Sequence, residues 1–245
     1  MVCPSPPLLA ADLTGRETVL PDLAKACADA VARLLAAGPD AVIVVGGGRA
    51  TAMWDPGSRL DLAAYGPGRP SGTAGRSVGV GRGRLAEEIR SGEHSLPLGL
   101  GLGAMLLDEA GYAGPRVLQA IAEDAPAAEC LELGASLAGR APRAGLLVVG
   151  DGSARRSLKA PGHLDERAAP FDASVERALR DGDMTALAGL DPHLARELMA
   201  TGRAAWQVLA GAFGAPAAGE ILYSGAPFGV SYLVAVLDAA GHGAL

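Results

Sequence analysis

Apolar residues recur every three or four positions along residues 18–37, from Leu20 to Leu35, and Gly38 follows as a stop signal. This spacing predicts an amphipathic helix that packs one face against a core. We expect further helices over residues 98–112, 125–138, 170–181 and 192–211. Asp191 is a suitable N-cap for the last of these because Pro192 follows it at the first helical position.

Short apolar runs predict the strands. Residues 41–45 are all apolar and lead into three glycines, and residues 145–149 repeat the pattern and lead into Gly150. A strand that is apolar on both faces suits the centre of a sheet that is covered on both sides. Other strands are expected over residues 116–121, 221–223 and 229–236. Since strands alternate with helices, the sequence predicts a single α/β domain over residues 1–245, a three-layer sandwich around a mostly parallel central sheet.

In such a sheet the ligand crevice lies outside the carboxyl ends of the strands. The segments after Val45 and Val149 are therefore the best places to look for function. Residues 49–75 are rich in Gly, Pro, Arg and Asp and predict a long irregular loop, a kind of segment that often has a function.

Composition narrows the classes of partner. Apolar residues make up 49% of the chain and charged residues 20%, which excludes a disordered tail. The formal net charge is −6 and aromatic residues make up 4%, so neither a basic face nor stacking platforms favour nucleic acid. The longest apolar run, residues 96–107, is too short to cross a bilayer, and the first residues lack the pattern of a signal peptide. We expect a cytoplasmic protein with no nucleic-acid or membrane partner.

Several catalytic motifs are missing from the sequence. Three scattered cysteines without a CxxC pair favour reduced thiols over a disulfide scaffold or a cysteine-built zinc site. The chain has neither a P-loop nor a GxSxG nucleophile elbow. The GxGxxA pattern at residues 81–86 lacks a good preceding strand and a following acidic residue, so it does not predict dinucleotide binding.

Two charged clusters each allow two interpretations. His163, Asp165 and Glu166 could supply metal ligands, or they could form an acidic surface turn. Arg155 and Arg156 follow Asp151 closely, together with Lys159. Arginine presents a planar fork that suits carboxylates and phosphates, so this cluster predicts either anion binding or internal pairing with the nearby aspartate.

Five segments, taken in order, resemble the LigB-type superfamily, which includes the class III extradiol ring-cleavage dioxygenases and the MEMO-like proteins. The opening CPSPPLL is similar to a Pro-His-Pro-Pro run, and the glycine-ended strand at residues 42–45 is similar to the strand before the second metal histidine. The segments EHSLPL, GDGSAR and LYSGAPFGVSY resemble later motifs of the family. The likeness is greatest to stand-alone proteins of actinobacterial type.

The resemblance implies a non-haem Fe(II) centre in active members, held by two histidines and a glutamate, with open positions for a catecholate and O₂. A further histidine acts there as acid and base. This chain departs from that pattern at each of these positions. Ser5 replaces the first histidine, Gly48 or Arg49 stands near the second, Ala154 replaces the acid–base histidine and Ser224 replaces the glutamate.

We therefore expect a LigB-like pocket with a degenerate iron site, no bound metal and no cofactor. It would bind a small anionic or phenolic ligand or serve an accessory role, and family analogy suggests a homo-oligomer. The expected pocket residues, with His94 as the candidate catalytic residue, are Ser5, His94, Asp151, Ser153, Arg155 and Ser224. The alternative is an active extradiol dioxygenase of a catecholic substrate whose Fe(II) is held by atypical ligands such as His94, Glu93 or Glu220. A third class, a pure interaction module, would show a large exposed apolar patch.

Overall fold

In the computed structural model, which describes residues 1–14, 18–62 and 95–239, strands and helices alternate along the chain. The strands are β1 (Val2–Cys3), β2 (Ala41–Gly48), β3 (Ala52–Trp54), β4 (Arg116–Ala122), β5 (Ala144–Val149), β6 (Ala217–Gly225) and β7 (Tyr232–Ala239). The helices are the 3₁₀-helix η1 (Pro7–Leu9), α1 (Ala11–Thr14), α2 (Pro21–Ala36), α4 (Leu98–Glu109), α5 (Ala127–Ala138), α6 (Ala168–Asp181), α7 (Met184–Ala188), α8 (Pro192–Glu197) and α9 (Arg203–Phe213).

The described strands form one seven-stranded sheet in the order β3-β4-β2-β5-β1-β7-β6. The central strands β4, β2, β5 and β1 are parallel, whereas β3 and β7 pair antiparallel with β4 and β1. Strand β6 is antiparallel to β7, so it points the same way as β1. The expected mostly parallel central sheet is confirmed.

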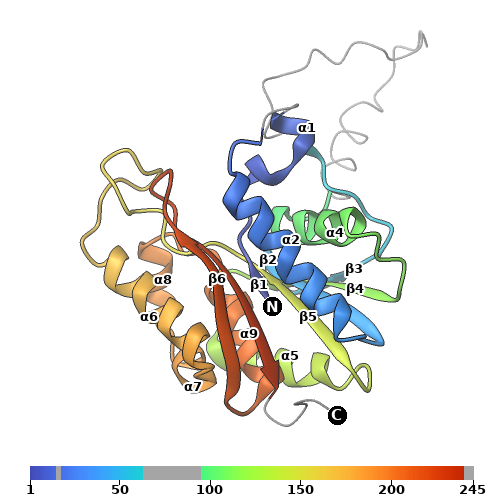
Figure 1. Cartoon of the computed structure of the whole chain (residues 1–245). Helices are drawn as coiled ribbons and strands as arrows, with labels where there is room; N and C mark the ends of the chain where they lie inside the picture. The colour runs from blue at the N-terminus through green and yellow to red at the C-terminus, as the bar shows by residue number, and fades with distance from the viewer. Residues whose placement is uncertain (15–17, 63–94, 240–245) are drawn as a thin grey trace, which may run out of the picture.

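Alternation along each strand divides the core into two layers. In β2, Val42 and Val44 pack with α2 and α4 on one face, and Ile43 and Val45 pack with α5, α6, α7 and α9 on the other. All four side chains are fully buried, as expected for a strand covered on both sides. The fold is therefore a three-layer α/β sandwich, with helices on both faces of the sheet (Figure 1).

The prediction of one continuous helix over residues 192–211 is wrong. The chain forms α8 and α9, separated by a turn in which Met199 adopts a φ of 57°. Gly202 then lies against the end of β5, since a Cβ added at Gly150 would be 2.4 Å from the Cα of Gly202. Glycine at position 150 permits this approach, whereas a Cβ at Gly202 would lie 2.4 Å from the Trp206 ring. The break brings Thr201 to the carboxyl edge of the sheet. Asp191 caps α8 as expected, because its carboxylate accepts a hydrogen bond from the N–H of His193 (2.8 Å).

Two strands were not predicted. Strand β1 contains only two residues, yet it lies between β5 and β7 inside the sheet. Strand β3 lies inside the expected irregular loop and pairs antiparallel with β4. Both strands are too short to produce a periodic pattern, so only their sheet partners define them. The part of the expected loop from residue 63 to residue 75 lies outside the described residues.

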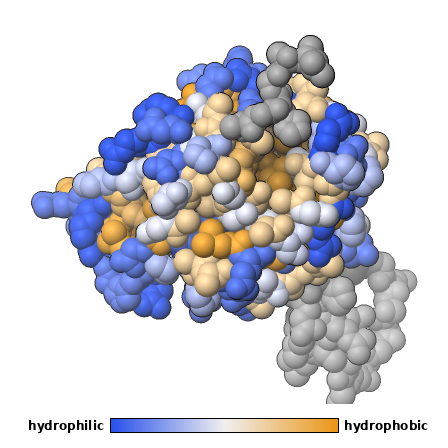
Figure 2. All heavy atoms as spheres, turned by 90° about the horizontal axis from the view of Figure 1, so that it is seen from below, coloured by the Kyte–Doolittle hydropathy of each residue, from blue (hydrophilic) through white to orange (hydrophobic). Residues whose placement is uncertain are grey.

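Figure 2 shows the face of the molecule seen from below. In the view from below, hydrophobic and hydrophilic residues mix, and hydrophilic ones gather toward the rim (Figure 2). No helix in the described ranges combines the length and apolar character that a bilayer crossing requires.

Candidate functional site

A large cleft lies at the carboxyl edge of the sheet, where the sequence predicts a crevice. Its walls come from the ends of β1, β2, β4 and β5, the start of α4 and the segment from α8 to α9. The cleft volume is about 1740 Å³. That exceeds the roughly 300–1,000 Å³ of typical ligand pockets, so a small ligand would occupy only part of it.

Glycines at the end of β2 let α4 approach the strand closely. A Cβ at Gly46 would lie 3.1 Å from the backbone nitrogen of Leu100, leaving little space for a side chain. The N-cap of α4 is Pro97, which makes no side-chain capping bond, and the first bond within the helix runs from the N–H of Gly101 to the carbonyl of Pro97. The N–H groups of the first turn are therefore left at the cleft wall, where they favour negative charge.

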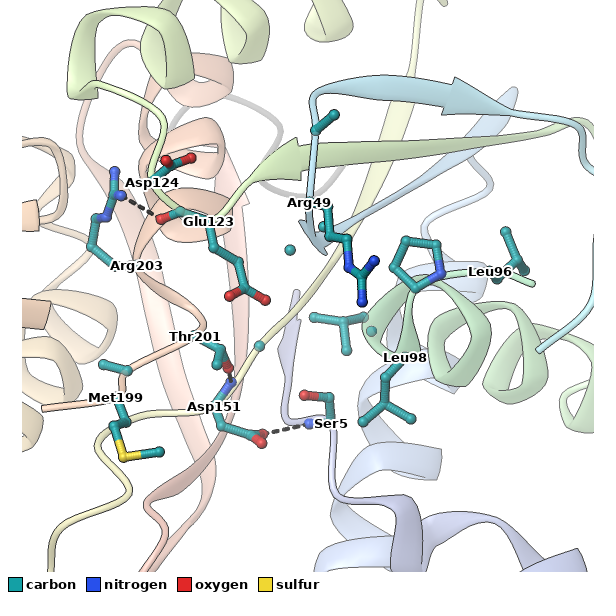
Figure 3. A pocket seen from close by; sticks show the side chains of 18 of the residues that line it. Ser5, Arg49, Leu96, Leu98, Glu123, Asp124, Asp151, Met199, Thr201 and Arg203 are labelled. Carbon is teal, nitrogen blue, oxygen red and sulfur yellow. Dashed lines mark hydrogen bonds between the residues drawn. The ribbon is translucent and has the colours of Figure 1, made fainter. Parts of the chain in front are cut away.

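Arg49 and Glu123 face each other across this cleft (Figure 3). Arg49 directly follows β2 and Glu123 directly follows β4. Among the described residues neither side chain has an ion-pair or hydrogen-bond partner. Burial, and secondarily the neighbouring Asp124 carboxylate, raise the pKa of Glu123.

Asp151 lies at the floor of the cleft, directly beyond β5. Its carboxylate accepts a 2.6 Å hydrogen bond from the N–H of Ser5, its own N–H donates to the hydroxyl of Thr201 (3.3 Å), and its carbonyl accepts from Gly202 (2.8 Å). Burial raises the pKa of Asp151 to about 6, although hydrogen bonding from Ser5 partly opposes that shift. The group can thus change charge close to neutral pH.

The buried Arg203 fixes the backbone on the Glu123 side of the cleft. Arg203 is 2% exposed and donates to the carbonyls of Glu123 and Ala125, at 2.6 Å each, and to the side-chain oxygen of Gln207 at 3.0 Å. Because the N–H of Glu123 also donates to the carbonyl of Gly48 (3.1 Å), the backbone of this acid is fixed from both sides. The backbone on the Glu123 side of the cleft is therefore preorganised for binding.

The structure brings together only part of the expected pocket. Ser5 and Asp151 line the cleft, and Ser5 is 7% exposed. Ser224 lines a separate small pocket of about 230 Å³ and donates a 2.6 Å hydrogen bond to Glu176. His94, the candidate catalytic residue, lies outside the described residues.

Ser153 and Arg155 do not line the cleft. Ser153 is completely buried, and its N–H and hydroxyl both donate to Asp172, at 2.8 and 2.6 Å, which gives it a structural role. The pairing of Asp151 with an arginine, one of the two interpretations of this cluster, is absent among the described residues, and Arg156 binds Asp172 at 3.1 Å. The side chain of Arg155 runs past Gly162, where its buried Nε has no hydrogen-bond partner.

The cluster at residues 163–166 forms a turn. Asp165 binds the guanidinium of Arg167, and these hydrogen bonds lower its pKa to about 2. Within the described ranges, no group of three or more His, Cys, Asp or Glu side chains could hold a metal.

The donor set also does not fit the Fe(II) centre that the resemblance implies. Ser5 and Ser224, which stand at two of the ligand positions, line different pockets. Glu220, an atypical ligand in the alternative interpretation, binds Arg33 of α2 at 2.6 Å. No reaction step through iron can be assigned to the described residues.

Sequence reasoning missed Arg49, Glu123, Thr201 and Arg203. The first two could have been found, because they directly follow strands whose carboxyl ends mark the crevice. The other two depend on the break between α8 and α9, which no periodic pattern of apolar residues predicts.

Comparisons with known proteins add little. No family model matches the chain, and no curated protein matches it. Among solved structures, the chain is similar to the crystal structure of the uncharacterized protein JW3007 from Escherichia coli K12, with 18% identity over 82% of this chain and 86% of that chain and a TM-score of 0.45. A likeness of this degree carries no inference about function.

Proposed function

We propose that this chain is a LigB-like protein with a degenerate iron site that binds a small anionic or phenolic ligand in the cleft. One observation carries the proposal: Arg49 points into the cleft without an ion-pair partner among the described residues, beside the uncapped start of α4. A guanidinium and free backbone N–H groups together suit a carboxylate or a phenolate. The donor set argues against ring-cleavage chemistry, since serines stand where imidazole and carboxylate would hold iron.

The proposal is tested by isothermal titration calorimetry with a panel of small acids and phenols: benzoate, salicylate, phenol and catechol. The Arg49→Ala variant should weaken binding of the preferred acid by about tenfold to a hundredfold, the scale of a hydrogen bond to a charged group. Arg140→Ala is the matched control, since this exposed arginine does not line the cleft. Absence of binding across the panel, or equal loss in both variants, would refute the proposal.

A second experiment distinguishes this proposal from the alternative, an active extradiol dioxygenase with Fe(II) on atypical ligands. Protein purified anaerobically with Fe(II) is analysed for iron and then for O₂ uptake with catechol. We expect substoichiometric iron and no uptake. Stoichiometric iron together with uptake would establish the dioxygenase instead.

The proposal also includes the cellular location and the binding partners of this protein. Composition supports a cytoplasmic protein with no nucleic-acid or membrane partner, and the resemblance supports a homo-oligomer. Sedimentation velocity would measure the oligomeric state directly.

A further inference from the structure

Side chains of both charges line the cleft, and besides the groups described above they include Asp61, Asp124 and Arg196. One wall carries Arg49 beside the first turn of α4, and the facing wall carries Glu123, with Asp151 at the floor (Figure 3). In the described part of the chain, Arg49 and Glu123 are not ion-paired to each other or to any other residue. Opposite charges that share a cleft without pairing leave a place for a ligand with both charges.

Neighbouring residues position Glu123, which forms the acidic side of the cleft. Gly47 leaves room for the Glu123 side chain, because a Cβ there would lie 3.0 Å from the Cγ and 3.1 Å from the Oε1 of Glu123. Arg203 and Gly48 fix the backbone of Glu123, as described above. The side chain of Glu123, which is exposed, therefore crosses the end of β2 toward the cleft.

A purely anionic ligand would use only the Arg49 side of this arrangement. An acid bound to Arg49 would face the carboxylates of Glu123 and Asp151 across the cleft. An ammonium group on the same molecule would instead meet these carboxylates as hydrogen-bond acceptors. Burial raises the pKa values of both acids, and a bound cation would offset that unfavourable environment.

We infer that the cleft takes a dipolar ligand, an amino carboxylate, with its carboxylate on Arg49 and its ammonium group between Glu123 and Asp151. The inference rests on the proposed function and narrows its ligand class. Apolar side chains of the same cleft, including Trp54, Leu98 and Met199, suit an amino carboxylate with an apolar body.

The inference is tested with three matched probes: L-phenylalanine, its des-amino acid phenylpropionate, and its decarboxylated amine phenethylamine. L-Leucine and its two corresponding analogues repeat the comparison with an aliphatic body. Affinities are measured by calorimetry for the wild type, Glu123→Gln and Arg49→Ala. Glu132→Gln, an exposed acid on α5 outside the cleft, is the control for Glu123→Gln.

We expect the amino carboxylate to bind wild-type protein at least tenfold more tightly than the des-amino acid. Glu123→Gln should remove that preference by weakening the amino carboxylate alone. Arg49→Ala should weaken both carboxylates tenfold or more and leave the amine unchanged, and Glu132→Gln should change none of these affinities.

Three results would overturn the inference. If the des-amino acid binds as tightly as the amino carboxylate, the proposal that the cleft binds a small acid stands, and the inference of a dipolar ligand is wrong. If Glu123→Gln tightens both acids equally, Glu123 serves only to pair with Arg49 in the free protein. If no probe and no member of the acid and phenol panel binds, both proposals fail.

Discussion

The surroundings of Asp151 alter the chemistry of its carboxylate. It is partly buried beneath the cleft, and its hydrogen bond from Ser5 does not offset the cost of burying a charge. Its pKa of about 6 lies above the ordinary value of 3.8. The folded protein therefore binds more protons than the unfolded chain between these two pH values, so the contribution of this group to stability decreases as the pH rises through 6.

Asp151→Asn should remove this pH dependence, because the amide keeps the acceptor for Ser5 without the charge. The gain in unfolding free energy relative to wild type should grow from pH 4 to pH 7 and then level off. Two pKa units correspond to about 3 kcal/mol, and partial solvent contact reduces the expected gain to about 1–2 kcal/mol. Urea denaturation across this range measures it, with the exposed Asp181→Asn as control. A difference between Asp151→Asn and wild type that does not vary with pH would contradict the assignment.

Helices α5 and α9 pack backbone against backbone below the acidic wall. A Cβ at Gly134 would lie 2.0 Å from the carbonyl oxygen of Val208, and one at Gly211 would lie 2.2 Å from the carbonyl oxygen of Leu131. These contacts involve backbone atoms, which cannot rotate away as a side chain can. The two glycines thus set the distance between the helices, and α9 begins with Arg203, which organises the cleft.

Gly134→Ala should destabilise the protein by about 1–3 kcal/mol, since the added methyl group forces the helices apart. Gly139→Ala, at the C-cap of the same helix, is the matched control, because the nearest neighbour of the added Cβ would be 3.7 Å away and the φ of −79° suits alanine. Thermal and urea denaturation of the two variants test this. Equal stability of the two variants would show that the helix contact is loose.

Over the whole described molecule, one sheet connects the two core layers. Strand β1 joins β5 to β7, so the parallel half and the antiparallel β7–β6 pair share a continuous ladder. Side chains from alternate positions of the same strands enter both layers. Removing either layer would expose the face of the sheet that it covers, so we expect the two layers to unfold together.

Unfolding should therefore be a single cooperative transition. Trp206 is fully buried in one core layer, and Trp54→Phe would leave it as the remaining tryptophan of the chain. In this variant the fluorescence of Trp206 and the far-UV circular dichroism of all helices should give the same midpoint in urea. Two separate midpoints would indicate two folding units.

The sequence by itself determined the alternation of strands and helices, the burial of the central strands and the edge of the sheet where a crevice lies. These properties depend on a residue and its near neighbours, so the order of apolar and polar positions is enough to predict them. The tertiary structure decided which side chains meet at that edge. Ser5 reaches Asp151 across 146 positions and Arg203 reaches Glu123 across 80, and such contacts follow from how strands pair and where helices break. For the same reason Ser224, matched by segment order alone, lies in a different pocket from Ser5.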